Sequence, residues 1–161
     1  MNHPKDIGDC STLAVMLVLR GNGYVISVPF GENTRYDLIA DDGHRLLRVQ
    51  CKTGRFRHGS VVFRPSSSYA HHASPRVTRQ TYGGQIDYFG VYCLDSGGVY
   101  LVPIDEITTT WMAMLRVDPA RNGQRKRIRL AADYQIGTVS VPALSVRRAP
   151  RASSGARGSC A

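Results

Sequence analysis

The sequence predicts one α/β domain, in which a mixed β-sheet core is flanked by helices, and three observations favour this class. The chain begins with an apolar helical segment that ends at a clear stop signal. Short strand-forming segments separated by turn residues follow it. With 161 residues and 42% hydrophobic content, the chain is long enough for one sizeable core and too short for two comfortable domains.

The first expected element is a helix whose N-cap is Asp6 or Asp9 and which ends near Arg20. The stop signal is Gly21-Asn22-Gly23, a sequence that commonly closes a helix. Residues 13–19 are apolar almost all round, so we expect this helix to be buried against a sheet.

The rest of the domain is predicted to consist mainly of strands and turns. Residues 24–28 are rich in strand formers, and residues 35–52 are predicted to form a hairpin with its turn at 41–44. Residues 65–84 have no clean periodicity and are interpreted as a basic loop. The other expected elements are a strand at 60–64, strands at 86–94 and 99–102, a short helix at 103–109, an apolar segment of undetermined type at 111–117, and one or two helical turns at 131–134.

The domain is predicted to cover residues 1–143, with residues 144–161 as a disordered basic tail that lacks apolar anchors. Two features indicate a cytoplasmic protein. The apolar run at 13–19 is far too short to span a membrane. The four cysteines form no CxxC pair, which is typical of reduced thiols rather than of disulfides or a zinc site.

Charge is distributed unevenly along the chain. The net charge is +9, and residues 45–82 contain eight Lys or Arg and no acidic residue. Residues 119–133 are basic again. Such a distribution is typical of a protein that binds a phosphate backbone, although a basic surface that serves solubility alone gives the same pattern.

The hairpin brings together residues with chemical potential. If Asp42-Gly43 is a two-residue turn, Asp37 lies opposite Arg48. Because side chains alternate along a strand, Asp37, Arg48, Gln50 and Lys52 then share one face, and a bulge or a three-residue loop would break this arrangement. By spacing alone, an exposed strand end with solvated side chains is the better explanation of these residues.

A carboxylate, an amide and an ammonium on one face are suited to phosphodiester cleavage. A carboxylate binds a hard cation such as Mg²⁺, which polarises the phosphoryl oxygen and lowers the pKa of its bound water. The oxygen of Gln50 can support the metal. Lys52 can orient or deprotonate the attacking water, or stabilise the charge that develops.

Five colinear stretches over residues 5–136 carry a family resemblance: KDIGD, GENTRYDLI, RLLRVQCKTGR, GGQIDYFGVYCLDSGGVYLVPIDEI and RNGQRKRIRLAADY. They resemble the PD-(D/E)XK endonuclease superfamily, in particular the branch of group I intron-associated homing endonucleases and their small bacterial relatives. The resemblance implies a restriction-endonuclease-like sheet, a centre that uses Mg²⁺ or Mn²⁺, and DNA as substrate.

The resemblance also implies roles for individual residues. Asp37 matches the metal-binding Asp, although Tyr36 replaces the preceding Pro. Gln50 stands where most members have Asp or Glu, and Lys52 matches the catalytic Lys. The catalytic set is therefore Asp37, Gln50 and Lys52.

One departure lies on the first helix, where Thr12 replaces the Glu of a GD-x-x-E pattern. Thr12 has no charge with which to hold a metal, so Asp37 is the one certain carboxylate. Asp9, three residues earlier, could partly substitute. The expected metal ligands are Asp37, Gln50 and Asp9.

Seven basic residues are expected to contact DNA, and five aromatic residues are expected to pack in the core rather than to stack on bases. Asp87, at the start of a strand, receives no role. The basic residues are Arg48, Arg55, Arg57, Arg64, Arg125, Lys126 and Arg127. The aromatic residues are Tyr82, Tyr88, Phe89, Tyr92 and Tyr100.

These features predict a metal-dependent endonuclease that hydrolyses duplex DNA in the manner of homing or restriction enzymes. We expect a homodimer or homotetramer, since a small domain with one centre must pair with another to cut both strands. Two alternatives stay open. One is a catalytically impaired DNA-binding module that keeps the fold, and the other is a basic protein associated with RNA or the ribosome.

Overall fold

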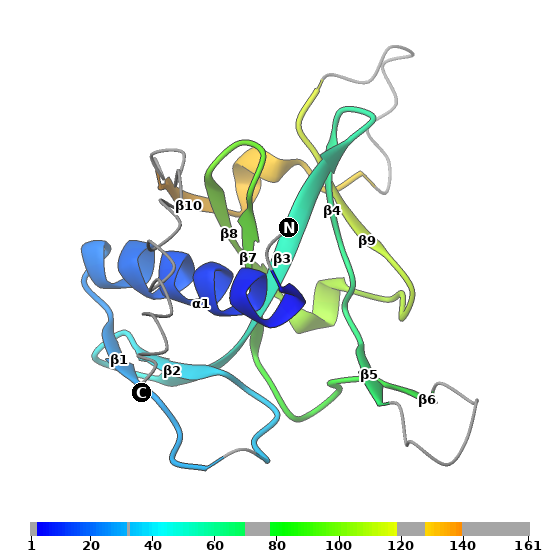
Figure 1. Cartoon of the computed structure of the whole chain (residues 1–161). Coiled ribbons are helices and arrows are strands. Elements are labelled where there is room, and N and C mark those ends of the chain that lie inside the picture. The colour runs from blue at the N-terminus through cyan, green and yellow to red at the C-terminus, as the bar shows by residue number, and fades with distance from the viewer. Residues whose placement is uncertain (1–2, 32, 70–77, 119–127, 140–161) are drawn as a thin grey trace, which may run out of the picture.

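A mixed β-sheet with an α-helix across one face forms the body of the protein in the computed structural model (Figure 1). The structure describes residues 3–31, 33–69, 78–118 and 128–139. The elements within these ranges are α1 (Pro4–Gly21), β1 (Val25–Ser27), β2 (Leu38–Asp41), β3 (Leu46–Arg57), β4 (Ser60–Phe63), β5 (Ser67–Tyr69), β6 (Thr78–Gln80), β7 (Tyr88–Cys93), β8 (Gly98–Pro103), the 3₁₀ turn η1 (Ile104–Glu106), β9 (Ala113–Arg116), the 3₁₀ turn η2 (Ala131–Asp133) and β10 (Gln135–Thr138).

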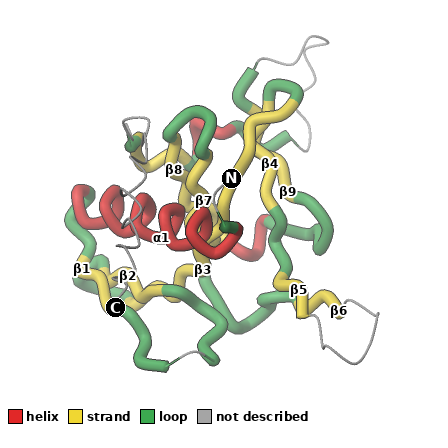
Figure 2. The backbone as a smooth tube through the Cα atoms, in the orientation of Figure 1, coloured by secondary structure: helices red, strands yellow, loops and turns green. Residues whose placement is uncertain are grey.

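Strand β3 is the centre of the sheet and contains 12 residues. It pairs antiparallel with β2 at its beginning, parallel with β7 along its middle, and antiparallel with β4 at its end. The strand order is β1-β2-β3-β7-β8-β10, and β9 pairs with β4. Figure 2 shows the β3–β4 hairpin extending away from the strands beside α1. The α/β class with a mixed sheet, predicted from the sequence, is confirmed.

Helix α1 begins earlier than the sequence predicts. Its N-cap is His3, whose Nδ1 accepts a hydrogen bond from the main-chain N–H of Lys5 at 3.3 Å. Pro4 follows at the first helical position, where its fixed φ fits and its missing N–H costs no hydrogen bond. The prediction of Asp6 or Asp9 as N-cap is therefore wrong. The helix ends at Gly21, as the stop signal predicts.

The helix buries one face rather than its whole circumference. Val15 and Leu19 are fully buried against the sheet, whereas Leu13 and Leu17 are 64% and 62% exposed. The sheet covers a single side of α1 (Figure 1), so the predicted burial against a sheet is confirmed for the near face, and the apolar residues of the far side are exposed. Burial of the near face unites α1 with β2, β3 and β7 in one apolar cluster.

The β2–β3 register is shifted by two residues from the predicted one. Leu38 pairs with Val49, and Asp41 pairs with Leu46. A four-residue loop replaces the expected two-residue turn, because Asp42 Oδ1 accepts hydrogen bonds from the N–H groups of His44 at 2.8 Å and Arg45 at 2.7 Å. The loop is longer by an even number of residues, so the predicted set of residues still shares one face.

Several short elements differ from their predictions. The interpretation of residues 65–84 as loop alone is wrong, since β5 and β6 pair there. The helix expected at 103–109 is the single 3₁₀ turn η1. The segment of undetermined type contains strand β9. Strand β10 was not expected: its residues carry little strand signal, and pairing with β8 and close packing of Gly137 on Val18 define it.

Among the described residues, no helix is both long enough and apolar enough to cross a membrane. Cys10, Cys51 and Cys93 are free thiols. The tail predicted at 144–161 lies outside the described residues.

Gly90 on β7 sets how closely α1 approaches the sheet. A Cβ at this position would lie 2.7 Å from Val15 Cγ1 and 3.0 Å from Val49 Cγ1. We expect Gly90→Ala to lower the free energy of unfolding by about 1–3 kcal/mol through overpacking, measured by urea denaturation. The control is Gly8→Ala in α1, where nothing lies within 4 Å of the added methyl group. There we expect a gain of up to about 1 kcal/mol, and equal losses for both variants would contradict this explanation.

Candidate active site

Asp37 lies immediately before β2, opposite Gln50 on β3, and its carboxylate takes the place of a strand partner. Its Oδ2 accepts a hydrogen bond from the main-chain N–H of Cys51 at 2.7 Å. This N–H points toward the side of β3 on which β2 lies, just beyond the last residue of β3 that pairs with β2. The side-chain amide of Gln50 donates to the same oxygen. The three residues are therefore joined without any cofactor.

The carboxyl group of Asp37 is under opposing influences. Partial burial raises its pKa, whereas the hydrogen bond from Cys51, the positive charge of Lys52 and the hydrogen bond from Gln50 lower it. Burial outweighs the others, so the pKa of Asp37 lies above its ordinary value. The ionised form is thus held at a cost in stability, which is typical of functional carboxylates.

Lys52 lies on the same face of β3, two residues after Gln50. Its Nζ is 2.9 Å from the hydroxyl of Tyr82 and donates to the carbonyl oxygen of Ser66 at 3.5 Å. It makes no hydrogen bond to Asp37, although its charge lowers the pKa of that carboxyl group. The structure therefore brings together the three residues predicted to be catalytic, with the ammonium beside the carboxylate.

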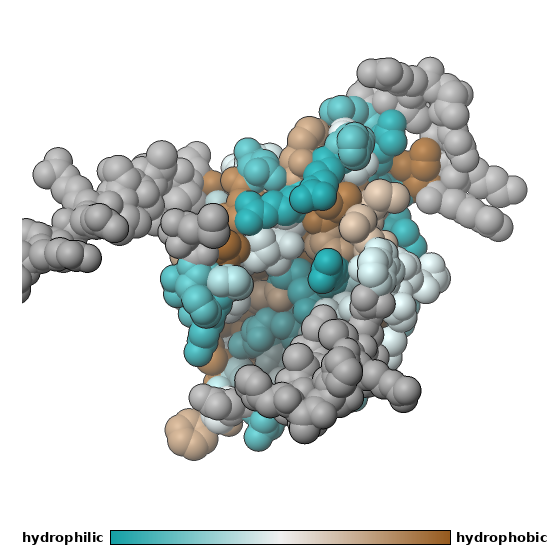
Figure 3. Space-filling model, turned by 45° about the vertical axis from the view of Figure 1, so that its right-hand side comes forward, coloured by the Kyte–Doolittle hydropathy of each residue, from teal (hydrophilic) through white to brown (hydrophobic). Residues whose placement is uncertain are grey.

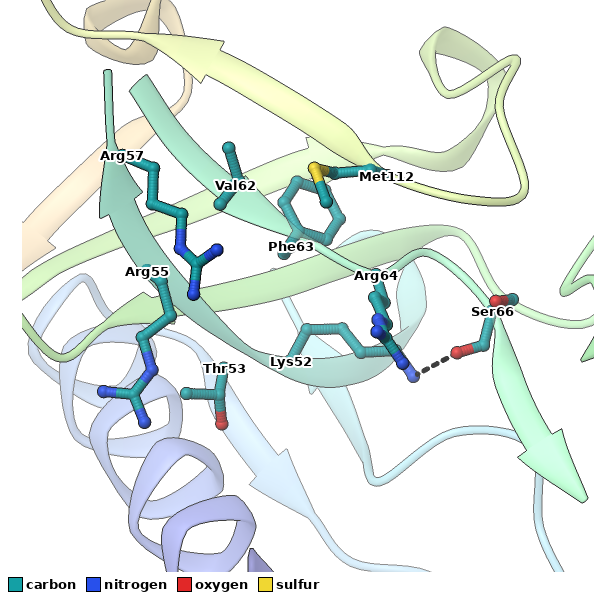
Figure 4. A pocket seen from close by; sticks show the side chains of 9 residues that line it. All are labelled: Lys52, Thr53, Arg55, Arg57, Val62, Phe63, Arg64, Ser66 and Met112. Atoms are coloured by element: carbon teal, nitrogen blue, oxygen red, sulfur yellow. Dashed lines mark hydrogen bonds between the residues drawn. The ribbon is translucent and has the colours of Figure 1, made fainter. Parts of the chain in front are cut away.

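A basic cleft of about 320 Å³ opens beside Lys52 along β3 and β4. The guanidinium groups of Arg55 and Arg57 lie on one side, and the ends of Lys52 and Arg64 on the other (Figure 4). The three arginines are exposed and have no ion-pair partner among the described residues. No acidic side chain is among the residues found to line the cleft, which are Lys52, Thr53, Arg55, Arg57, Val62, Phe63, Arg64, Ser66 and Met112. Hydrophilic side chains surround a hollow in the face shown in Figure 3.

Arg48 is engaged differently from these arginines. Its Nη2 lies 2.9 Å from Asp87 Oδ1 and its Nε 3.1 Å from Asp87 Oδ2, and its main-chain N–H donates to Oδ2 at 2.7 Å. These contacts hold the pKa of Asp87 below its ordinary value. Asp87, to which the sequence analysis assigned no role, therefore binds Arg48. The guanidinium of Arg48 is occupied by this ion pair.

Thr12 and Asp9 occupy distinct positions on α1. The Thr12 hydroxyl donates to the Gly8 carbonyl at 3.2 Å and contacts the thiol of Cys51, whose pKa is raised by burial. Thr12 therefore faces β3 at the level of the centre, on the sheet face opposite to Gln50 and Lys52. Asp9 is exposed and makes no hydrogen bond or ion pair within the described part of the chain.

The oxygen atoms around Gln50 fit a hard cation. Its Nε2 donates toward Asp37 Oδ2 and toward the carbonyl oxygen of Cys51 at 3.3 Å, so a polarised N–H group already lies between two oxygens. Half a turn of the amide presents Oε1 instead. Mg²⁺ accepts oxygen ligands and is commonly bound by one or two carboxylates together with water and phosphate. The described residues contain no cluster of three or more His, Cys, Asp and Glu side chains, in keeping with the single carboxylate.

Sequence reasoning missed two residues of the site, Arg35 and the hydroxyl of Tyr82. Tyr82 packs in the core as predicted, with 4% of its surface exposed, and its hydroxyl still reaches Lys52. The guanidinium of Arg35 lies 4.3 Å from the centre of the Tyr82 ring. A buried tyrosine in an otherwise polar, basic segment was the available signal. Arg125, Lys126 and Arg127 lie outside the described residues.

Comparison with known proteins identifies the family and the fold. A family model described as PD-(D/E)XK endonuclease matches residues 2–137. The chain belongs to the PD-(D/E)XK endonuclease family. The solved structure of a bacterial homing endonuclease, I-Ssp6803I, superposes with a TM-score of 0.68 at 22% identity, over 83% of this chain and 89% of that chain. This likeness confirms the predicted restriction-endonuclease-like fold. No curated protein matches the sequence.

The raised pKa of Asp37 predicts a gain in stability from Asp37→Asn in this PD-(D/E)XK domain. Because the folded-state pKa exceeds the ordinary value of 3.8, wild-type stability falls as pH rises from that value through the folded pKa. Asn removes this loss and can still accept the hydrogen bond from Cys51. We expect Asp37→Asn to unfold at higher urea than wild type at pH 7 in EDTA, with the difference vanishing below about pH 3.5. A variant less stable than wild type at pH 7 would contradict the assignment.

Proposed function

We propose that this protein is a metal-dependent endonuclease that hydrolyses phosphodiester bonds in duplex DNA, of the homing or restriction type. The observation that supports the proposal is the hydrogen-bonded pair of Asp37 and Gln50, with Lys52 on the same face of β3 beside a cleft lined by arginines. Family membership supports endonuclease chemistry in general.

DNA binding is proposed for the exposed arginines of β3 and β4. Arg55 and Arg57 follow Lys52 on the same strand, so a phosphate bound by either lies within a few residues of the centre. Arg64 stands on the opposite wall of the cleft. Three guanidinium groups without acidic partners suit the spaced negative charges of a phosphate backbone.

Asp37, Gln50 and the carbonyl of Cys51 would hold Mg²⁺ or Mn²⁺, and Asp9 is proposed to reach the metal from α1. The bound ion supplies Lewis-acid polarisation of the phosphoryl group and a water molecule with a lowered pKa. Lys52 places positive charge where the negative charge of the transition state develops, and it orients the attacking water. Asp37 fixes Gln50 through their hydrogen bond.

One observation favours a second candidate function, a DNA-binding module that has lost cleavage. Thr12 and Gln50 are both neutral, so Asp37 is the sole carboxylate with contacts in the described centre. An RNA-binding role rests on the basic charge alone, since that charge attracts any polyanion.

We propose a homodimer or homotetramer as the active form. A single chain carries one centre, and duplex cleavage requires a cut in each strand.

The decisive test is cleavage of plasmid and genomic DNA pools with Mg²⁺ or Mn²⁺. We expect Lys52→Ala to lower the rate about 10²–10³-fold, because it removes one preorganised positive group, and Asp37→Ala to lower it at least as much. Lys5→Ala and Asp6→Ala, exposed residues at the start of α1, are the matched controls and should cut as wild type does. Asp9→Ala tests the proposed third ligand.

Tight duplex binding by wild type without cleavage in either ion would establish the binding module instead. Cleavage that survives Lys52→Ala would remove Lys52 from the mechanism.

The arginines of the cleft predict the salt dependence of DNA binding. We expect Arg55→Ala and Arg57→Ala each to reduce the slope of log K against log [salt] by about 1, with similar losses on unrelated duplex sequences. Arg45→Ala in the β2–β3 loop, at the opposite end of β3, should leave the slope unchanged. The measurement is fluorescence anisotropy across a salt series. Equal slopes for all three variants would place the DNA elsewhere, and tighter binding of RNA than of duplex DNA would overturn the assigned substrate.

A further inference from the structure

The segment 81–87, between β6 and β7, contacts three cationic side chains around the centre. A main-chain carbonyl, a phenol hydroxyl and a carboxylate of this short segment each meet one cation. The pairs are Thr81 O with Arg35 Nη2 at 2.9 Å, Tyr82 hydroxyl with Lys52 Nζ at 2.9 Å, and Asp87 Oδ1 with Arg48 Nη2 at 2.9 Å. The segment therefore holds Lys52, whose charge acts on Asp37, together with two arginines.

Tyr82 is the most firmly held member of this segment. Its ring is 4% exposed and packs edge-on against Phe89, with centroids 5.6 Å apart and an interplanar angle of 87°. The guanidinium of Arg35 lies 4.3 Å from the ring centroid. Arg35 is itself fixed by hydrogen bonds to Gln85 and Ser67 at 2.6 and 3.0 Å. Because the Tyr82 ring is packed on these sides, its position is fixed, and the position of its hydroxyl is fixed with it.

Lys52, in contrast, has a long flexible side chain that must be held by its partners. A free lysine side chain samples many rotamers, and ordering it has an entropic cost. The described contacts of its ammonium are the 2.9 Å hydrogen bond to Tyr82, the longer one to Ser66 at 3.5 Å, and the face of the Tyr82 ring 4.7 Å away. The Tyr82 hydroxyl is the shorter and better defined of the two hydrogen-bond partners.

From these contacts we propose that Tyr82 is a positioning residue, whose hydroxyl fixes the Lys52 ammonium beside Asp37 before substrate binds. This inference rests on the proposed function, since it concerns the residue assigned to act on the phosphate. Tyr82 itself does not touch the reacting atoms. Its contribution is preorganisation: Lys52 need not be ordered again at each encounter with DNA.

The alternative is that Tyr82 serves packing alone. The ring suffices for packing on Phe89 and for the contact with Arg35, so Tyr82→Phe preserves both and removes only the hydroxyl. Tyr92→Phe is the matched control, because Tyr92 is also buried, at 2% exposure, and belongs to the cluster beneath α1 rather than to the Lys52 side.

The first measurement is cleavage kinetics of the full chain. We expect Tyr82→Phe to lower kcat about tenfold with KM changed less than about twofold, because one hydrogen bond to a charged group is lost and the arginines still bind DNA. In the Lys52→Ala background the same substitution should have no further effect. Equal loss in both backgrounds, or an equal loss from Tyr92→Phe, would overturn the positioning role.

The second measurement does not depend on cleavage. The chain has three lysines, Lys5, Lys52 and Lys126, so lysine labelled with ¹³C and ¹⁵N gives few side-chain NMR signals, and Lys52→Ala assigns the signal of interest. In EDTA without DNA, we expect the Lys52 Cε order parameter to exceed that of exposed Lys5. It should fall to the Lys5 value in Tyr82→Phe and remain unchanged in Tyr92→Phe.

The two measurements separate the failure of this inference from the failure of the proposed function. A wild-type protein that does not cut DNA, but whose Lys52 is ordered through Tyr82, would refute nuclease activity and retain the fixed ammonium. A protein that cuts, with Lys52 equally ordered in wild type and Tyr82→Phe, would retain nuclease activity and refute the role of Tyr82.

Discussion

The centre depends on one mismatch in the sheet: β3 continues for 12 residues, whereas β2 begins only at Leu38. Beyond that point the N–H of Cys51 has no partner on β2, and a buried main-chain donor must be satisfied. The Asp37 carboxylate supplies the acceptor. The same geometry that completes the sheet therefore fixes a carboxylate beside Gln50 and Lys52, and the exposed end of β3 is left to carry arginines.

The segment before β7 engages three of the basic side chains, Arg35, Arg48 and Lys52. Of these, Lys52 is the cation whose charge lowers the pKa of Asp37. Asp87, the Tyr82 hydroxyl and a main-chain carbonyl each engage one of them. This pairing leaves Arg55, Arg57 and Arg64 as cations without acidic partners in the described chain. Arg35, Arg48 and Lys52 thus have partners within the described chain, whereas the three arginines proposed to bind DNA do not.

Local signals predicted the parts of the site that depend on alternation along a strand. A register error of two residues moved the position opposite Asp37 from Arg48 to Gln50. The predicted residues still share one face, because side chains alternate along a strand with a period of two. Contacts between distant segments could not be predicted. Asp87 meets Arg48 because β7 lies parallel beside β3, and Tyr82 reaches Lys52 across 30 positions. Strand β10 likewise depends on β8 rather than on its own residues.

The amide of Gln50 changes the electrostatics of the centre in the absence of a metal ion. A second carboxylate there would repel Asp37 and raise its pKa further, whereas Gln50 donates a hydrogen bond and lowers that pKa. The two side chains are consequently hydrogen-bonded without metal, and the neutrality of Gln50 weakens the attraction of the centre for a divalent ion. On the proposed function, the missing negative charge must come from the phosphates of the substrate, which Mg²⁺ commonly accepts as ligands. The cation and DNA would then bind together. The arginines of β3 would bind the DNA backbone so that one of its phosphates completes the set of metal ligands.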